Sequence, residues 1–160
     1  MQSTSTPKTN SEQQHRFGRL LGQAARLLSN RVNLAFRHAG YDITIEQWTI
    51  LADLTQKDGL NQQVFADRNI KNKASITSLI NNLEKKGWVS RKADRDDRRS
   101  NRIHISKEGW RIHDLLLPIL QDTLAQTLDY LPEDELITAM NITESLVKEL
   151  QSEGEPSTTV

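Results

Sequence analysis

Cationic side chains crowd the middle of this 160-residue chain, where together they could neutralise a polyanion. The whole chain holds 21 basic and 21 acidic residues, so its formal net charge is zero. Residues 61–105, however, hold eleven cations and five anions, a balance of +6 that the rest of the chain offsets. A basic segment between acidic flanks indicates one surface that meets nucleic acid. An ordinary solvated face would give the same count.

The segment DRDDRRS at residues 94–100 is the densest cluster of charge. An arginine at the tip of a loop can enter the minor groove of DNA, where the narrow width concentrates negative potential. Asp97 lies two positions before Arg99 and can fix its guanidinium in one rotamer through a bidentate pair. The alternative is a solvated salt-bridge loop, in which each exposed pair contributes only about 0–1 kcal/mol.

Residues 73–86 have the period of an amphipathic helix whose outward face suits contact with base edges. The inward residues recur at three- and four-residue steps and are Ile76, Leu79, Ile80 and Leu83. The outward residues are small, polar or basic and are Lys73, Ala74, Ser75, Thr77, Ser78, Asn81, Asn82 and Lys85. Side chains of this size allow a close approach to the bases. A plain polar surface helix is the alternative.

The neighbouring segments predict the rest of a winged helix-turn-helix. A helix begins after Thr44, with Gln47 completing a capping box, and a short helix follows Asn61. Gly87 ends the helix at 73–86, and the period then changes to two, which predicts a hairpin over 89–105. In this arrangement the last helix enters the major groove and the hairpin, or wing, reaches an adjacent groove or the backbone.

Long amphipathic helices are predicted at 12–39, 106–130 and 133–150, and their apolar faces exceed what so small a lobe can cover. We therefore expect them to pack across a two-fold axis against a second copy of the chain. Such a homodimer would set two recognition helices about one DNA turn apart, on a pseudo-palindromic site. The candidate dimerisation residues are Phe17, Leu20, Leu128, Leu131, Leu146 and Leu150.

The predicted fold is mainly α with a small two- to three-stranded β wing. A winged helix-turn-helix lobe at 40–105 stands between dimerisation helices at 12–39 and 106–151. Residues 1–11 and 152–160 lack an apolar period and are predicted to be disordered tails. No apolar run approaches the roughly 18 to 20 residues of a membrane span, and the first residues lack the apolar core of a secretory signal, so the prediction is a cytoplasmic protein.

Nothing in the sequence indicates catalysis or a cofactor. The chain has no cysteine and no glycine-rich phosphate loop, and its four histidines show no ligand spacing. The carboxylates at 94–97 lie among cations that keep them ionised, which makes them poor acids. We therefore predict neither an enzyme nor a bound cofactor or metal, although ligands converging from separate helices would make a metal sensor.

The chain resembles the MarR family of bacterial regulators over about residues 12–150. The family's wing pattern, Asp-x-Arg followed by Leu-Thr, is met by Asp97 and Arg99 and then by Ile105 and Ser106. TIEQW at 44–48 is similar to the start of the family's second helix, and LEKKGWV at 83–89 to the end of its recognition helix. Ser78 departs from an arginine that similar members often carry, and it cannot make that residue's bidentate contact with guanine.

The resemblance implies a homodimer that places Arg99 in the minor groove and the helix at 73–86 in the major groove. The candidate DNA contacts are Lys73, Ser75, Thr77, Ser78, Asn82, Arg91, Arg95, Arg98, Arg99 and Arg102. It also implies an effector site between the dimerising helices and the lobe, for a small aromatic or anionic molecule. The candidates there are His15, Arg16, Arg19, Trp48, Arg111 and His113; in the alternative, Trp48 belongs to the core and the arginines are solvated.

Together these features predict a sequence-specific transcription regulator, a repressor, that binds its operator as a homodimer and is released by a small ligand. The rival hypothesis is a winged helix used for contact with another protein.

Overall fold

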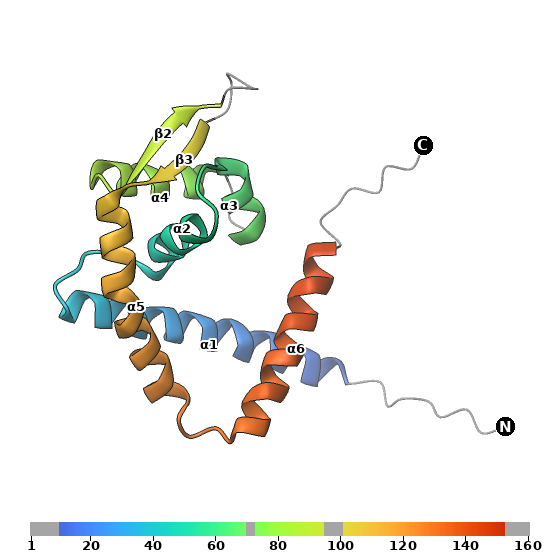
Figure 1. Ribbon diagram of the computed structural model, residues 1–160. Coiled ribbons are helices and arrows are strands. Elements are labelled where there is room, and N and C mark those ends of the chain that lie inside the picture. The colour runs from blue at the N-terminus through green and yellow to red at the C-terminus, as the bar shows by residue number, and fades with distance from the viewer. Residues whose placement is uncertain (1–9, 70–72, 95–100, 153–160) are drawn as a thin grey trace, which may run out of the picture. The chain divides into compact units, whose positions relative to one another are not determined.

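The computed structural model describes residues 10–69, 73–94 and 101–152 (Figure 1). Its elements are, in chain order, α1 (Ser11–His38), α2 (Ile45–Gln56), β1 (Leu60–Asn61), α3 (Gln62–Asn69), α4 (Lys73–Lys85), β2 (Val89–Ala93), β3 (Asn101–Ile105), α5 (Lys107–Leu128) and α6 (Glu133–Ser152). The chain divides into two compact units, Met1–Thr123 and Leu124–Val160. Within the described ranges, no helix has the length and apolar content needed to cross a membrane.

The first unit confirms the predicted winged helix-turn-helix, with three short helices before an antiparallel hairpin. The sheet has the strand order β1-β3-β2, and β2 pairs with β3 so that Val89 faces Ile105 and Arg91 faces Ile103. The third strand, β1, pairs Leu60 with Ile103. It is two residues long, which is too short for a period of two to show in the sequence.

The helix ends follow the signals expected from the sequence. Thr44 Oγ1 accepts a hydrogen bond from the Gln47 amide at 3.3 Å, and Gln47 Oε1 accepts one from the Thr44 amide at 3.1 Å, which confirms the capping box of α2. Gly87 follows α4 with a φ of +71°, a left-handed conformation that favours glycine. Trp88 then donates its amide to the Leu83 carbonyl at 3.0 Å, which closes the last turn.

The core of the first unit draws on all its longer elements. The fully buried side chains are Val32, Phe36, Ile50, Leu51, Leu54, Phe65, Ile76, Ile80, Leu83, Ile103 and Leu116. Each contributes roughly 1.5–3 kcal/mol through burial of apolar surface. Because Ile76, Ile80 and Leu83 all lie in this core, α4 is fixed with its polar face outward.

Helix α6, in the second unit, differs from α4 because its apolar side is not buried. The sequence gives it an apolar side, yet none of its residues is buried in the single chain. Met140, Ile142 and Leu150 are each about half exposed. The described part of one chain thus leaves this apolar side uncovered, which is the condition expected of a helix that packs against a second copy.

Candidate nucleic-acid interface

Helix α4 presents a polar surface that its buried face holds in place. Ser78, Asn81, Asn82 and Lys85 are exposed, on the side of the helix opposite Ile76 and Ile80. The exposed set combines a hydroxyl, two amides and a cation, which are groups that contact base edges and phosphates. The side chain of Lys73, another expected contact, lies outside the described residues.

Two of the residues expected to contact bases, Ser75 and Thr77, are partly buried inside the lobe. Thr77 Oγ1 accepts a hydrogen bond from Gln62 Nε2 at 2.6 Å. Gln62 is the first residue of α3. Its bond to Thr77 therefore sets the contact between α3 and α4, which are the two helices of the helix-turn-helix.

Arg91, on β2, is bound to helix α4 by three hydrogen bonds. Its amide donates to Glu84 Oε1 at 3.2 Å, and its guanidinium donates to Glu84 Oε2 through Nη1 and to Asn81 Oδ1 through Nη2, the latter at 2.7 Å. The Arg91 side chain is only 19% exposed. These bonds join the first strand of the wing to the second half of α4.

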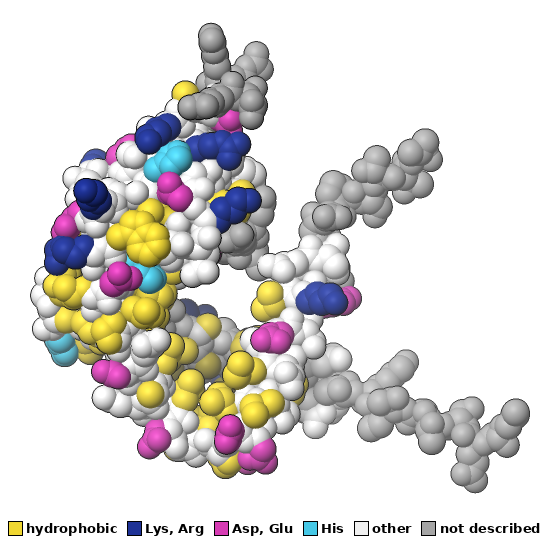
Figure 2. All heavy atoms as spheres, viewed as in Figure 1, with side chains coloured by type: hydrophobic (Ala, Val, Ile, Leu, Met, Phe, Trp, Pro, Cys, Tyr) yellow, Lys and Arg dark blue, Asp and Glu magenta, His cyan; other side chains and the backbone are white. Residues whose placement is uncertain are grey.

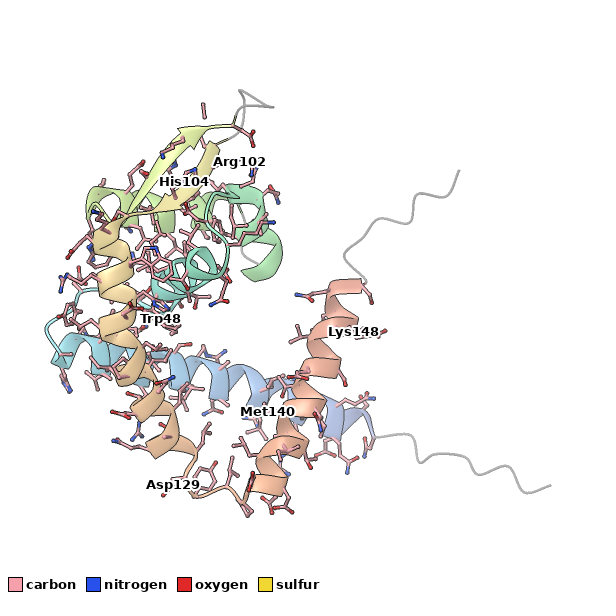
Figure 3. All side chains as sticks on the ribbon, in the orientation of Figure 1. Trp48, Arg102, His104, Asp129, Met140 and Lys148 are labelled. Atoms are coloured by element: carbon pink, nitrogen blue, oxygen red, sulfur yellow. The ribbon has the colours of Figure 1, made fainter. Side chains whose placement is uncertain are left out.

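Arg102, on β3, is held at the other side of the wing (Figure 3). Its Nε lies 2.7 Å from Oδ2 of Asp94, whose side chain is 7% exposed, and its Nη1 donates to the Gly59 carbonyl at 3.2 Å. A buried carboxylate next to a cation is stabilised by charge pairing that water screens weakly. Arg102 thus ties β3 to the end of β2 and to the turn before β1.

Asp58 fixes the base of β3 to the turn after α2. Its Oδ1 accepts the Ile105 amide at 2.8 Å, and its Oδ2 lies 2.8 Å from His104 Nδ1. Partial burial acts to raise the pKa of Asp58, but the hydrogen bonds from His104 and Ile105 outweigh it, so the pKa lies below its ordinary value. Gly59 follows with a φ of +72°, and a Cβ there would lie 3.0 Å from the His104 ring.

The start of α5 is pressed against the junction between α4 and β2. Ser106 caps α5 by accepting the Gly109 amide at 3.0 Å, as its place in the sequence predicts. The same Ser106 donates its hydroxyl to the Gly87 carbonyl at 2.7 Å and its amide to the Trp88 carbonyl at 3.0 Å. A Cβ on Gly109 would lie 2.2 Å from that Trp88 oxygen, so only glycine allows this approach.

The tip of the wing, which contains Arg95, Asp97, Arg98 and Arg99, lies outside the described residues. The predicted hold of Asp97 on Arg99 stays a prediction. Figure 2 shows the basic side chains that gather around the described part of the hairpin. Among the described residues, no three His, Asp or Glu side chains gather as metal ligands would.

The expected effector residues are only partly brought together. Trp48 and His113 stack with ring centroids 5.0 Å apart, and Trp48 Nε1 donates to the His113 carbonyl at 3.4 Å. Arg111 pairs with Glu108 at 2.6 Å, and this hydrogen bond lowers the pKa of the Glu108 carboxyl. The three remaining candidates, His15, Arg16 and Arg19, are exposed on α1, and no described contact joins them to the stack.

Residues 43–100, which run from just before α2 to the segment between β2 and β3, match the model of the MarR family. Over this segment the chain is similar to the MarR family. The transcriptional regulator HosA of Escherichia coli O157:H7 is 25% identical over 84 residues, which are 52% of this chain and 62% of HosA. The chain thus spans less than two thirds of that relative. The transcriptional repressor MdtR of Bacillus subtilis is 25% identical over 111 residues, covering 69% of this chain and 72% of MdtR.

Solved structures of MarR proteins share the fold. A MarR protein from Peptoclostridium difficile superposes with a TM-score of 0.78 at 19% identity, covering 96% of this chain and 97% of its own. CouR from Rhodococcus jostii, solved with p-coumaroyl-CoA bound, superposes with a TM-score of 0.71 at 23% identity, covering 82% of this chain and 91% of its own. These likenesses establish the winged-helix architecture.

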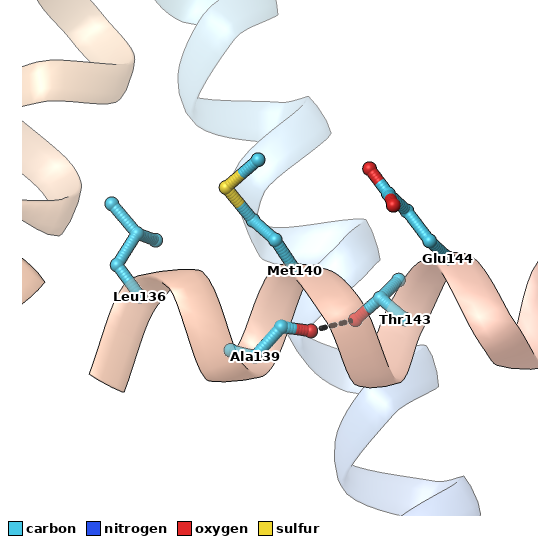
Figure 4. Close-up of a pocket in the computed structure, with 5 residues that line it drawn as sticks. All are labelled: Leu136, Ala139, Met140, Thr143 and Glu144. Atoms are coloured by element: carbon cyan, nitrogen blue, oxygen red, sulfur yellow. Dashed lines mark hydrogen bonds between the residues drawn. The ribbon is translucent and has the colours of Figure 1, made fainter. Parts of the chain in front are cut away.

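Of the residues expected at the dimer interface, Leu131 lies between α5 and α6, and the others lie on the terminal helices. Phe17 and Leu20 on α1 are 50% and 47% exposed. Leu128, Leu131 and Leu146 are half-buried, and Leu150 is exposed. On α6, Leu136, Ala139, Met140, Thr143 and Glu144 line a shallow cavity of about 300 Å³ (Figure 4). A concave apolar strip of this kind suits the knob of a facing helix.

Sequence reasoning missed the groups that hold the wing. Glu84 was counted only among the five anions of residues 61–105 and Asp94 as one acid among several, while Asp58 and Gly109 were given no part in holding the wing. Glu84 could have been found, because it is the one acid on a helix otherwise rich in amides and hydroxyls. Asp94 and Asp58 gave no such signal, since their partners depend on the register of β3.

Proposed function

We propose that this chain is a sequence-specific, DNA-binding transcription regulator that acts in the cytoplasm as a homodimer. The observation that carries the proposal is the exposed polar face of α4, held beside a wing whose two strands are both fixed by acid–arginine pairs. A surface that reads base edges must keep its shape, because each misplaced donor or acceptor loses its partner. The fold, shared with transcription regulators, supports the same function.

The proposed DNA contacts fall on two elements. On α4 they are Lys73, Ser75, Thr77, Ser78 and Asn82, and on the wing they are Arg95, Arg98, Arg99 and Arg102. The α4 set would meet the major groove, and Arg99, steered by Asp97, would enter the minor groove. Binding alone carries this function, so it requires no catalytic group and no resident cofactor.

A second copy of the chain is the proposed partner of the exposed apolar faces. The residues proposed to meet it are Phe17, Leu20, Leu128, Leu131, Leu146 and Leu150. Large apolar side chains left exposed along helices in this way mark a protein interface. A two-fold axis between the copies gives two recognition helices and hence a pseudo-palindromic operator. Occupation of such a site within a promoter makes repression the expected outcome, the activity that the name of MdtR records.

Release by a small ligand is the proposed mode of regulation. CouR was solved with an aromatic acyl thioester bound, which shows that a protein of this fold accepts such a molecule. In this chain the Trp48–His113 stack offers an aromatic surface, with Arg111, Arg16 and Arg19 as the proposed sources of positive charge and His15 as a further polar contact. Trp48 is 9% exposed, so an aromatic effector must displace His113 or stack beside the pair. It would weaken DNA binding only by favouring a dimer geometry that DNA does not.

Selection from a pool of random-sequence duplexes tests the proposed function directly. The full-length protein should enrich a pseudo-palindrome whose half-sites are spaced by about one DNA turn. Nuclease protection should then cover both half-sites symmetrically. Enrichment of no common sequence would favour the rival function, a winged helix that contacts another protein.

A further inference from the structure

Arg91 stands out among the basic residues of the wing because its guanidinium turns inward to α4. We infer that Arg91 is a positioning residue rather than a phosphate contact: it holds Asn81 so that only the amide hydrogens of Asn81 face the DNA. The inference rests on the proposed DNA-binding function and gives Asn81 a specific part in it. Under this inference Asn81 contacts the DNA, and Arg91 only orients Asn81.

The first support is the number of bonds that Arg91 already makes. Both carboxylate oxygens of Glu84 are taken by Arg91, one by its amide and one by its guanidinium. A third bond runs from Nη2 to Asn81. The charge of Arg91 is therefore balanced by Glu84, and a balanced cation releases few counterions when it approaches phosphate. With 19% of its side chain exposed, little of the guanidinium is open to a phosphate.

The second support is the direction that this bond imposes on Asn81. A guanidinium has only donors, so the group that faces it at 2.7 Å must be the Asn81 carbonyl oxygen. The Asn81 amide nitrogen then points away from Arg91 with both hydrogens available. Because Asn81 is exposed on the polar face of α4, these hydrogens are offered to whatever lies against that face.

This orientation decides which DNA groups Asn81 can recognise. Asparagine reads adenine with two bonds, accepting from N6 through its carbonyl and donating to N7 through its amide. The first of these is disfavoured here, because the Asn81 carbonyl oxygen is directed at Arg91, which occupies one of its two lone pairs. Asn81 is left as a donor to an acceptor, such as O6 or N7 of guanine or a phosphate oxygen. We therefore expect Asn81 to favour acceptors and to be indifferent to the adenine amino group.

Lys92 offers a matched control, since it follows Arg91 on β2, carries the same charge and is exposed. The variants Arg91→Met and Lys92→Met each remove one cation and keep an aliphatic side chain. On a duplex selected by the wild-type protein, Arg91→Met should lower affinity on the order of tenfold while the log–log salt slope stays unchanged. If Arg91 instead met phosphate, the slope of the dimer would fall by about 1.8, at roughly 0.9 for each contact. That fall would overturn the inference.

A double-mutant cycle and modified duplexes test the role of Asn81. Asn81→Ala should cost affinity in the wild type and little further in the Arg91→Met background, because its orientation is already lost. Duplexes with 7-deazaguanine or with single methylphosphonates identify the acceptor as a base or a phosphate, and either result agrees with the inference. If removal of the adenine amino group weakens the wild type but not Asn81→Ala, the carbonyl of Asn81 reads adenine and the inference is wrong.

A measurement without DNA keeps this inference separable from the proposed function. In the free protein, nitrogen relaxation of the Asn81 side-chain amide should show a rigid group. It should become mobile in Arg91→Met and stay rigid in Lys92→Met. If no duplex is bound at all, the proposed function fails, yet the relaxation data still decide whether Arg91 holds Asn81. A mobile Asn81 amide in the wild type would overturn the inference.

Discussion

The lobe from α2 to β3 and the helix α6 differ in whether their side chains find partners within the chain. In the lobe, several charged groups have partners within the chain: Lys86 pairs with Asp42, just before α2, at 3.4 Å, Arg91 with Glu84 and Arg102 with Asp94. On α6, apolar groups such as Met140 remain exposed in the single chain. We call the first region complete, because these charges are paired within the chain, and the second incomplete, because its apolar side chains are not covered within the described chain. We read the first as the surface that meets DNA and the second as the surface that makes the dimer.

The largest effect is expected from a charge placed on the incomplete region. Leu146→Glu should dissociate or unfold the dimer, because an unpaired carboxylate in an apolar interface costs roughly 3 kcal/mol or more. Light scattering measures the mass directly. Lys148→Glu, on the same helix, is the control and should leave a dimer. An intact dimer in Leu146→Glu would remove α6 from the interface.

Where α5 packs against the complete region, a single added methyl group should have the next largest effect. Gly109→Ala places a Cβ 2.2 Å from the Trp88 carbonyl oxygen and should lower the free energy of unfolding by about 1–3 kcal/mol. Gly18→Ala, on α1, meets no atom within 4 Å and should raise that free energy by up to about 1 kcal/mol. Denaturant titration of both variants gives the comparison. Equal stabilities would mean that α5 is not pressed against the α4–β2 junction.

The wing tip provides the test that separates function from folding. Arg99→Ala should weaken operator binding by roughly 1–3 kcal/mol and leave the folded dimer intact. Fluorescence anisotropy with a selected duplex measures the first, and light scattering the second. Binding equal to that of the wild type would take Arg99 out of the DNA-contacting set.

The smallest effect concerns the base of β3. The pKa of Asp58 is depressed in the folded state, so its contribution to stability is full above the ordinary value of 3.8 and is lost as pH falls through the lower folded value. Because Asp58 is about half exposed, that contribution stays below about 1 kcal/mol. Asp58→Asn should therefore be slightly less stable than the wild type at pH 6, and the difference should shrink below pH 4. A difference independent of pH would show that the charge of Asp58 has no role.

The sequence predicted what depends on neighbouring residues. The apolar period of α4, the terminator Gly87 and the capping box of Thr44 and Gln47 are all local, and the structure confirms each of them. Periodicity also showed the apolar side of α6, and the predicted cover of that side by a second copy stays a prediction. In the described part of the single chain, this apolar side is exposed to solvent.

The sequence could not predict what depends on distant pairing. Arg102 reaches Asp94 and Gly59 only because β3 pairs with both β1 and β2 in one register. Asp97 was expected to steer an arginine, and the described wing shows this arrangement with other residues, Asp94 for Arg102 and Glu84 for Arg91. Composition predicted that acidic side chains would pair with arginines, but it could not predict which acid pairs with which arginine.

The central claim is that the complete lobe of this protein binds DNA through charge and shape. Its most direct test is the affinity of the full-length dimer for a selected duplex, measured over a series of salt concentrations. We predict that log affinity falls steeply and linearly with log salt, by about 0.9 for each phosphate that the protein neutralises. An affinity that does not change with salt would contradict the claim.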